Sequence, residues 1–199
     1  MQRYLFACFT IFIAVTPVLP DWTTNLEKNG IRIETRAVSG SAYKEFRATM
    51  TAKTSMAKVQ EVMQDIPAYA TWMKDCKEAR RIRKNSENSG VVYSLQATPW
   101  PIVEREAVVE YQFRKQLKPP EISITLTAVP EIIPQTPGKV RISRLAGSWQ
   151  FRALGAGEVQ IVYSLHTEPG GNLPSWAVAG MIAHLPYETL SKLREKLEK

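Results

Sequence analysis

The most regular hydropathy pattern lies at the C-terminal end of the chain. Between Asn172 and Lys199, apolar residues recur at spacings of three and four, which predicts an amphipathic helix with one apolar side. Asn172 is a suitable N-cap, and Pro174 supplies a backbone angle that suits the first turn. Because Pro186 removes one intrahelical hydrogen bond, we expect a kink near His184. The predicted apolar stripe consists of Leu173, Trp176, Ala179, Gly180, Ala183, Tyr187, Leu190, Leu193 and Leu197.

Small residues occupy the middle of this stripe, at Ala179, Gly180 and Ala183. Small residues in a helix usually permit close packing against a solid core, and this is the simpler interpretation. The alternative is a hollow beneath the helix, at the place where large side chains would otherwise fill the space. The pattern alone leaves both interpretations open.

Most of the remaining chain alternates apolar and polar residues, which predicts β-strands. Ser55 is a candidate N-cap for a second helix that ends before Pro67, and residues 68–73 form a loop or a short helical turn. A long antiparallel sheet with one apolar face needs helices to cover that face. We therefore predict an α+β fold in which a curved antiparallel sheet wraps around the C-terminal helix. The predicted strands are residues 31–36, 43–51, 77–83, 91–97, 104–114, 122–129, 140–151 and 159–167.

Period-two alternation also assigns one side of each later strand to a common apolar face. This face is predicted to contain Val91, Tyr93 and Leu95, then Ala107, Val109, Tyr111 and Phe113, then Ile122, Ile124 and Leu126, then Trp149 and Phe151, and finally Val159, Ile161, Tyr163 and Leu165.

The first twenty residues differ from the rest of the chain. Residues 5–15 are almost wholly apolar and follow a single basic residue, a pattern typical of an export signal and too short to span a bilayer comfortably. We predict a signal over residues 1–20, one domain over residues 21–199, and a periplasmic location. Because no clear cleavage motif follows, an uncleaved membrane anchor is the alternative. Removal of the signal leaves Cys76 as the remaining cysteine, so no intrachain disulfide is expected.

Four stretches carry a resemblance to a known family: residues 65–78 (DIPAYATWMKDCKE), 99–106 (PWPIVERE), 147–149 (GSW) and 168–176 (EPGGNLPSW). Together they are similar to the START (steroidogenic acute regulatory protein-related lipid transfer) domain family, specifically its exported bacterial members. The resemblance implies a helix-grip fold that encloses a hydrophobic ligand. Glu106 stands where the family has an aspartate. The buried acid–arginine pair of sterol-binding relatives is missing at the corresponding positions, near residues 92–94 and at Tyr111, which argues against sterol specificity.

The resemblance implies a domain that binds a lipid or another hydrophobic small molecule and carries it without covalent chemistry, and we expect a monomer. Polar tips inside such a pocket fix the orientation of the ligand, and Tyr93, Tyr111, Tyr163 and Arg105 are the candidates. Arg105 is either buried in the pocket or placed on the rim of the sheet in a salt bridge to a loop. The predicted ligand-binding residues are Tyr93, Leu95, Arg105, Val109, Tyr111, Leu126, Trp149, Tyr163, Trp176, Ala179, Gly180 and Ala183.

Catalytic motifs are absent from the sequence. It contains no Gly-x-Ser-x-Gly, His-Glu-x-x-His or paired Cys-x-x-Cys motif, and residues 155–157 lack the third glycine of a phosphate loop. We therefore expect no catalytic residue, metal ion or cofactor, and we interpret His184 as an ordinary helix residue. A helix-grip enzyme, a cyclase or hydrolase acting on a hydrophobic substrate in the same pocket, is the alternative.

The formal net charge of +7 favours anionic partners. The basic run over residues 74–84 either protects an edge strand from pairing or makes transient contact with an anionic membrane surface during ligand delivery. The chain matches no nucleic-acid recognition module, so no nucleic acid is expected. We expect the pocket to open at the helix near Pro186 and at the loops 99–101 and 130–137.

Overall fold

The computed structural model describes residues 21–171 and 173–199 of the chain. The predicted export signal over residues 1–20 and the predicted N-cap Asn172 lie outside the described residues, and so does the side chain of Trp176. Among the described helices, none has the length and apolar character needed to cross a membrane.

Ten strands form a single sheet, in the order β1-β2-β3-β10-β9-β7-β6-β5-β4, with β8 paired to β6. All neighbours are antiparallel except β6 and β8, which are parallel. The strands are β1 (Thr23–Lys28), β2 (Ile31–Arg36), β3 (Glu45–Lys53), β4 (Cys76–Ser86), β5 (Ser89–Gln96), β6 (Arg105–Leu117), β7 (Pro120–Ala128), β8 (Val140–Arg141), β9 (Arg144–Gly155) and β10 (Glu158–Glu168).

Within residues 21–171 and 173–199, the helical elements are α1 (Met56–Gln64), α2 (Tyr69–Trp72), the 3-10 turn η1 (Pro130–Ile132) and α3 (Ser175–Leu197). The Ser55 hydroxyl accepts a hydrogen bond from the backbone N–H of Lys58 at 3.1 Å, which confirms Ser55 as the N-cap of α1. The chain enters α3 through Pro174, so this helix begins later than predicted.

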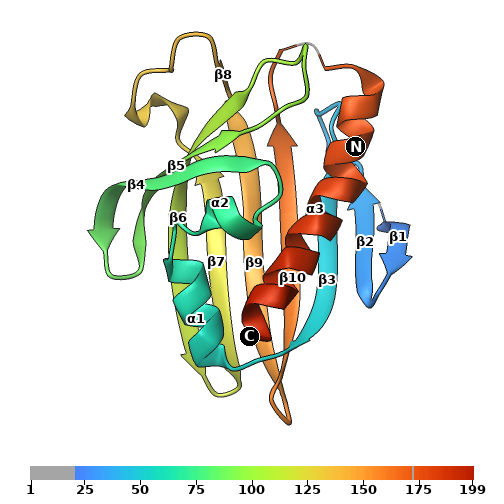
Figure 1. The fold of residues 1–199 in the computed structure, drawn as a ribbon, viewed down its shortest axis with the longest axis vertical. Coiled ribbons are helices and arrows are strands. Elements are labelled where there is room, and N and C mark those ends of the chain that lie inside the picture. The colour runs from blue at the N-terminus through green and yellow to red at the C-terminus, as the bar shows by residue number, and fades with distance from the viewer. Residues whose placement is uncertain (1–20, 172) are drawn as a thin grey trace, which may run out of the picture.

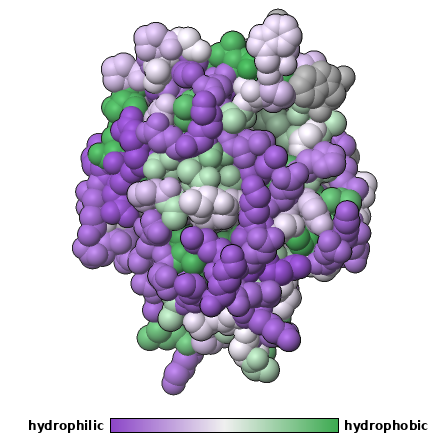
Figure 2. Space-filling model, in the orientation of Figure 1, coloured by the Kyte–Doolittle hydropathy of each residue, from purple (hydrophilic) through white to green (hydrophobic). Residues whose placement is uncertain are grey.

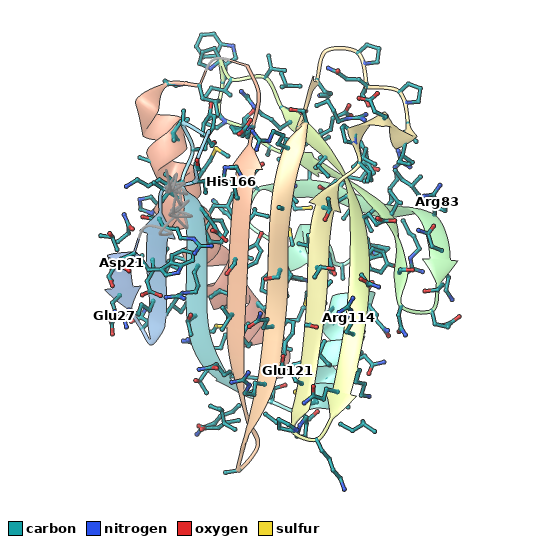
Figure 3. The ribbon with its side chains drawn as sticks, turned by 180° about the vertical axis from the view of Figure 1, so that it is seen from behind. Asp21, Glu27, Arg83, Arg114, Glu121 and His166 are labelled. Carbon is teal, nitrogen blue, oxygen red and sulfur yellow. The ribbon has the colours of Figure 1, made fainter. Side chains whose placement is uncertain are left out.

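All three helices lie on one side of the curved sheet, and α3 crosses this side diagonally (Figure 1). The other side, seen in Figure 3, carries polar side chains such as Arg114 and Glu121. The main core forms where α1 and the C-terminal half of α3 meet the strands, and its most enclosed members include Leu190, Leu193 and Phe151. The predicted α+β architecture, a curved antiparallel sheet around a C-terminal helix, is confirmed.

Besides small shifts at most strand ends, the structure differs from the predicted strands in two places. The predicted strand over residues 140–151 is divided into β8 and β9, which pair with different neighbours. The pattern continues through the break because Ile142, between the two strands, is also buried. Strand β1 was not predicted, because most of its residues are exposed and its alternation is therefore weak.

Candidate functional site: a cavity beneath the C-terminal helix

A cavity of about 550 Å³ lies between the sheet and the N-terminal half of α3. This volume is within the range of roughly 300–1,000 Å³ typical of small-molecule pockets. Figure 2 shows apolar side chains gathered in the middle of the helix-bearing face, with polar residues around them. The cavity therefore supports the second of the two interpretations of the small residues in the helix: the space beneath α3 is not filled by side chains.

The helix lines the cavity with Ala177, Gly180, Met181, His184 and Leu185, which recur at spacings of three and four. A Cβ atom added at Gly180 would meet no neighbouring atom within 4 Å, so the missing side chain leaves open space. This face of α3 is only partly the one predicted. Ala179 is exposed and does not line the cavity.

Ala183 is half-buried but also lies outside the lining, and the side chain of Trp176 is outside the described residues. Small and apolar residues occupy neighbouring sides of this helix, so hydropathy could not choose between them. Met181 and His184, which the prediction missed, carry no sequence signal of their own. They are found only by continuing the helical spacing, four residues on from Ala177 and from Gly180 respectively.

The strands supply the opposite wall, and here the predicted inward face is largely the observed one. Val109, Tyr111, Leu126, Trp149 and Tyr163 all line the cavity. Cross-strand pairing brings Tyr111 opposite Leu126 and Trp149 opposite Tyr163. The rings of Trp149 and Tyr163 stack with centroids 3.8 Å apart and an interplanar angle of 3°, giving this wall a rigid aromatic surface. Burial raises the pKa of the Tyr163 hydroxyl, so Tyr163 is neutral.

Strand β5 turns toward the cavity the face opposite to the one predicted. Val92, Ser94 and Gln96 line the cavity, whereas Leu95 packs into a small apolar cluster on the other face of the sheet. Tyr93 lies at the margin of the cavity, but its ring belongs to that same cluster. The outer face of β5 is the more apolar one because a second layer covers it, whereas Ser94 and Gln96 on the cavity face are polar, so period-two alternation selected the wrong face.

The outer layer is the loop over residues 130–137, which is attached to β6 through Glu106. The Glu106 carboxylate is fully buried and accepts hydrogen bonds from Tyr93 Oη at 3.0 Å, from the Thr136 backbone N–H at 2.9 Å and from Arg141 at 2.8 Å. Burial alone would raise the pKa of Glu106, but these hydrogen bonds outweigh it and lower the pKa. The loop 130–137 does not line the cavity, so the structure gives no support to the prediction that it opens the pocket.

Arg105 lies beside Glu106 in sequence, points to the opposite face, and lines the cavity. Its side chain is 5% exposed. One terminal nitrogen donates to the Val103 carbonyl and the other donates to the Gly170 carbonyl at 3.3 Å, whereas Nε has no partner. No carboxylate of the described residues forms an ion pair with it. Of the two predicted positions for Arg105, the structure shows the buried one, and burial lowers its pKa.

Apart from Lys74, which precedes the strand, the basic run over residues 74–84 lies on β4, an edge strand of the sheet. Lys77, Arg80 and Lys84 each pair with a glutamate, and their side chains are about half exposed. This arrangement agrees with the simpler interpretation of the run as a solvated edge. His184 is exposed, and the described residues contain no group of histidine, cysteine and acidic side chains that could hold a metal ion.

Comparison with known proteins identifies the family. The START domain family model matches residues 18–199. The chain belongs to the START domain family. This membership agrees with the sheet that curves around a terminal helix and with the cavity enclosed between them.

Solved START structures have the same architecture. A STAR-related lipid transfer protein from Xanthomonas axonopodis is 31% identical, with a TM-score of 0.80, and the match covers 89% of this chain and 99% of that one. Human StAR-related lipid transfer protein 5 is 17% identical, with a TM-score of 0.78 over 88% of this chain and 86% of that one, and this likeness concerns the fold. An uncharacterized protein of Pseudomonas aeruginosa is 28% identical over 100% of this chain and 98% of its own length.

Proposed function

We propose that this protein binds one hydrophobic molecule, a lipid, in the cavity beneath α3 and transfers or presents it without covalent chemistry. The observation that carries the proposal is the space of about 550 Å³ under Gly180, which no side chain of the described residues fills. Removal of apolar surface from water contributes about 25 cal/mol per Å², so such a lining favours an apolar ligand. The printed name of the Xanthomonas axonopodis neighbour, a lipid transfer protein, supports the same class of activity.

Ligand entry requires that part of the enclosure moves. The loop over residues 97–104 contributes Thr98, Pro99 and Ile102 to the lining, whereas its Trp100 is 92% exposed. The adjoining segment that leads into α3 contributes Pro169 and Leu173. These two segments, together with the N-terminal half of α3, form the proposed entry. Hydrogen–deuterium exchange of the protein with and without ligand tests this assignment. We expect the backbone amides of these segments to exchange faster when the ligand is absent.

The main test is to fill the cavity. Gly180→Leu places a side chain in the open space, and Ala179→Leu is the matched control because Ala179 is exposed on a different side of the same helix. We expect Gly180→Leu to bind a fluorescent long-chain lipid at least about tenfold more weakly than the wild type, a loss of about 1.4 kcal/mol, and Ala179→Leu to bind normally. Equal affinity in all three proteins would contradict the proposal.

A second measurement distinguishes a carrier from an enzyme. Lipids extracted from the purified protein are identified by mass spectrometry, offered back to ligand-free protein, and recovered after incubation. A carrier returns the same molecule and moves it between vesicles in proportion to protein concentration. Conversion of the molecule to a product by the pure protein would instead support the alternative, a helix-grip enzyme.

A further inference from the structure

The wall of the cavity along β6 begins with a charge and continues with apolar side chains. Its lining residues are Arg105, Ala107, Val109, Tyr111 and Phe113, at alternate positions of one strand. At about 3.3 Å per residue, the eight steps from Arg105 to Phe113 span about 26 Å along the strand. The cavity therefore has a buried cation at the start of β6 and a long, mainly apolar wall along this strand.

The Arg105 guanidinium at the start of β6 has unused hydrogen-bonding capacity. Arginine carries five N–H donors, and the two partners of Arg105 among the described residues are the backbone carbonyls of Val103 and Gly170. Nε is buried and has no partner. Both acceptors are neutral, so they satisfy donors without balancing the charge.

Arg141 is a second arginine of this protein with a buried side chain, and its charge is balanced by a carboxylate. Arg141 pairs with the fully buried Glu106 carboxylate at 2.8 Å and also donates to the carbonyls of Pro130, Ile133 and Pro134. An isolated buried charge is costly, and paired charges are the rule in protein interiors. Arg105 lacks the carboxylate that Arg141 has, and its open donors adjoin the cavity.

The other charged groups of the lining do not supply the missing anion. Lys74 pairs with Asp75 at 3.3 Å, and Lys84 pairs with Glu87 at 2.6 Å, so both acidic residues of the lining already have basic partners. Arg81, which is exposed, adds a further positive charge. In total, four basic and two acidic side chains border the cavity within the described residues, which favours an anion.

We propose that Arg105 binds the carboxylate or phosphate group of an anionic amphiphile whose apolar tail lies along β6 in the cavity. This inference rests on the proposed lipid-binding function and specifies its ligand class. Arginine recognises both groups through paired N–H donors in a planar arrangement. Arg105 is then the specificity-determining residue for charged over neutral lipids.

The experiment compares ligands that differ in the head group alone: palmitate, monohexadecyl phosphate and hexadecanol. We expect the wild type to bind palmitate or hexadecyl phosphate roughly tenfold to a hundredfold more tightly than hexadecanol, the range that one charge-assisted pair supplies. Arg105→Gln is expected to remove this preference, because it weakens binding of the two anionic amphiphiles much more than binding of hexadecanol. Arg105→Lys, which keeps the charge but not the planar donors, is expected to retain part of it.

Inorganic phosphate, titrated alone and in competition with the amphiphiles, separates a lipid head group from a free anion. Weak competition by phosphate and tight binding of the amphiphiles supports the proposal. Tight binding of phosphate alone, with no gain from the hexadecyl chain, overturns it. Equal affinity of the wild type for hexadecanol and both anionic amphiphiles also overturns it, and this comparison needs no variant, so it holds even if Arg105→Gln fails to fold.

Failure of this inference differs from failure of the proposed function. Tight binding of hexadecanol and of the anionic amphiphiles with equal affinity leaves a lipid carrier without charge selectivity. Binding of none of the three by a protein shown to be free of endogenous lipid contradicts the lipid-binding function itself.

Discussion

The two halves of α3 lie on the same sheet but contact very different surroundings. In the C-terminal half, Leu190 and Leu193 are fully buried and Leu197 nearly so, packed into the main core. In the N-terminal half, Gly180 and Met181 border a cavity. One helix thus anchors the fold at one end and covers a cavity at the other. The difference suggests that stability and ligand binding depend on separate stretches of the same element.

At the start of β6, the two faces of the sheet differ in a similar way, here in whether a buried charge is paired. Glu106 is fully buried with three hydrogen-bonding partners on the outer face, whereas Arg105 is buried on the cavity face without a carboxylate partner. The C-terminal half of α3 and the surroundings of Glu106 are therefore closely packed, with the buried charge paired. The N-terminal half of α3 and Arg105 border the cavity, where there is open space and an unpaired charge.

The largest effect on the free energy of unfolding is expected at Glu106, the buried carboxylate that pairs with Arg141. Glu106→Gln removes the negative partner of Arg141 and leaves that guanidinium buried without a counter-charge. Breaking a buried ion pair in this way costs about 3–5 kcal/mol of unfolding free energy. Urea unfolding followed by tryptophan fluorescence measures the loss. The matched control is Arg105→Gln in ligand-free protein, which removes an unpaired charge and is expected to be neutral or stabilising.

The same carboxylate predicts a pH dependence. The pKa of Glu106 is lower in the folded protein than in the unfolded chain, so folding is favoured by its ionised form. This contribution is complete above the unfolded pKa of about 4.3 and is lost as the pH falls through the lower folded pKa. As the pH falls from about 4.3 through the lower folded pKa of Glu106, the wild type is therefore expected to lose stability more steeply than Glu106→Gln. Parallel curves for the two proteins would contradict the assignment.

The next effect compares the two halves of α3 directly. Leu193→Ala removes a fully buried side chain from the core and is expected to cost about 3 kcal/mol. Met181→Ala truncates a side chain that already borders open space and is expected to cost less than about 1 kcal/mol. Equal losses in chemical denaturation would show that the N-terminal half is packed as tightly as the C-terminal half.

A smaller effect of opposite sign is expected at Gly180. Glycine within a helix is about 1 kcal/mol less favourable than alanine, and a Cβ at this position meets no atom within 4 Å. Gly180→Ala should therefore raise the free energy of unfolding by up to about 1 kcal/mol. Thermal unfolding measures the gain. A loss would mean that the space beneath Gly180 is occupied in the ligand-free protein.

The smallest effect concerns Cys76, a buried cysteine outside the cavity. Burial raises the pKa of its thiol to about 11, so little thiolate is present at pH 8. We expect slow reaction with a disulfide reagent in native conditions and fast reaction after unfolding. Fast native reaction would indicate that the cluster of Ile66, Cys76 and Ala79 opens readily.

The order of elements and the inward face of most strands could be predicted from the sequence. Alternation along β6, β7, β9 and β10 identifies Val109, Tyr111, Leu126, Trp149 and Tyr163 because each of these strands has one face that is clearly more apolar. The family-like motifs carried the further step to a ligand cavity. The Ser55 cap was also predicted, since a side chain that caps a helix acts through neighbours in sequence.

The orientation of β5, the cavity-facing side of α3 and the environment of Arg105 were decided by tertiary structure. Tyr93 and Leu95 face an outer layer that approaches β5 from residues far along the chain, so local alternation carries no information about it. In α3, small residues on adjacent sides give the helix no preferred side until the sheet is in place. The sequence by itself determines which elements form, because periodicity is a local property. Which face closes a core and which encloses a space depends on elements that meet only in the folded protein.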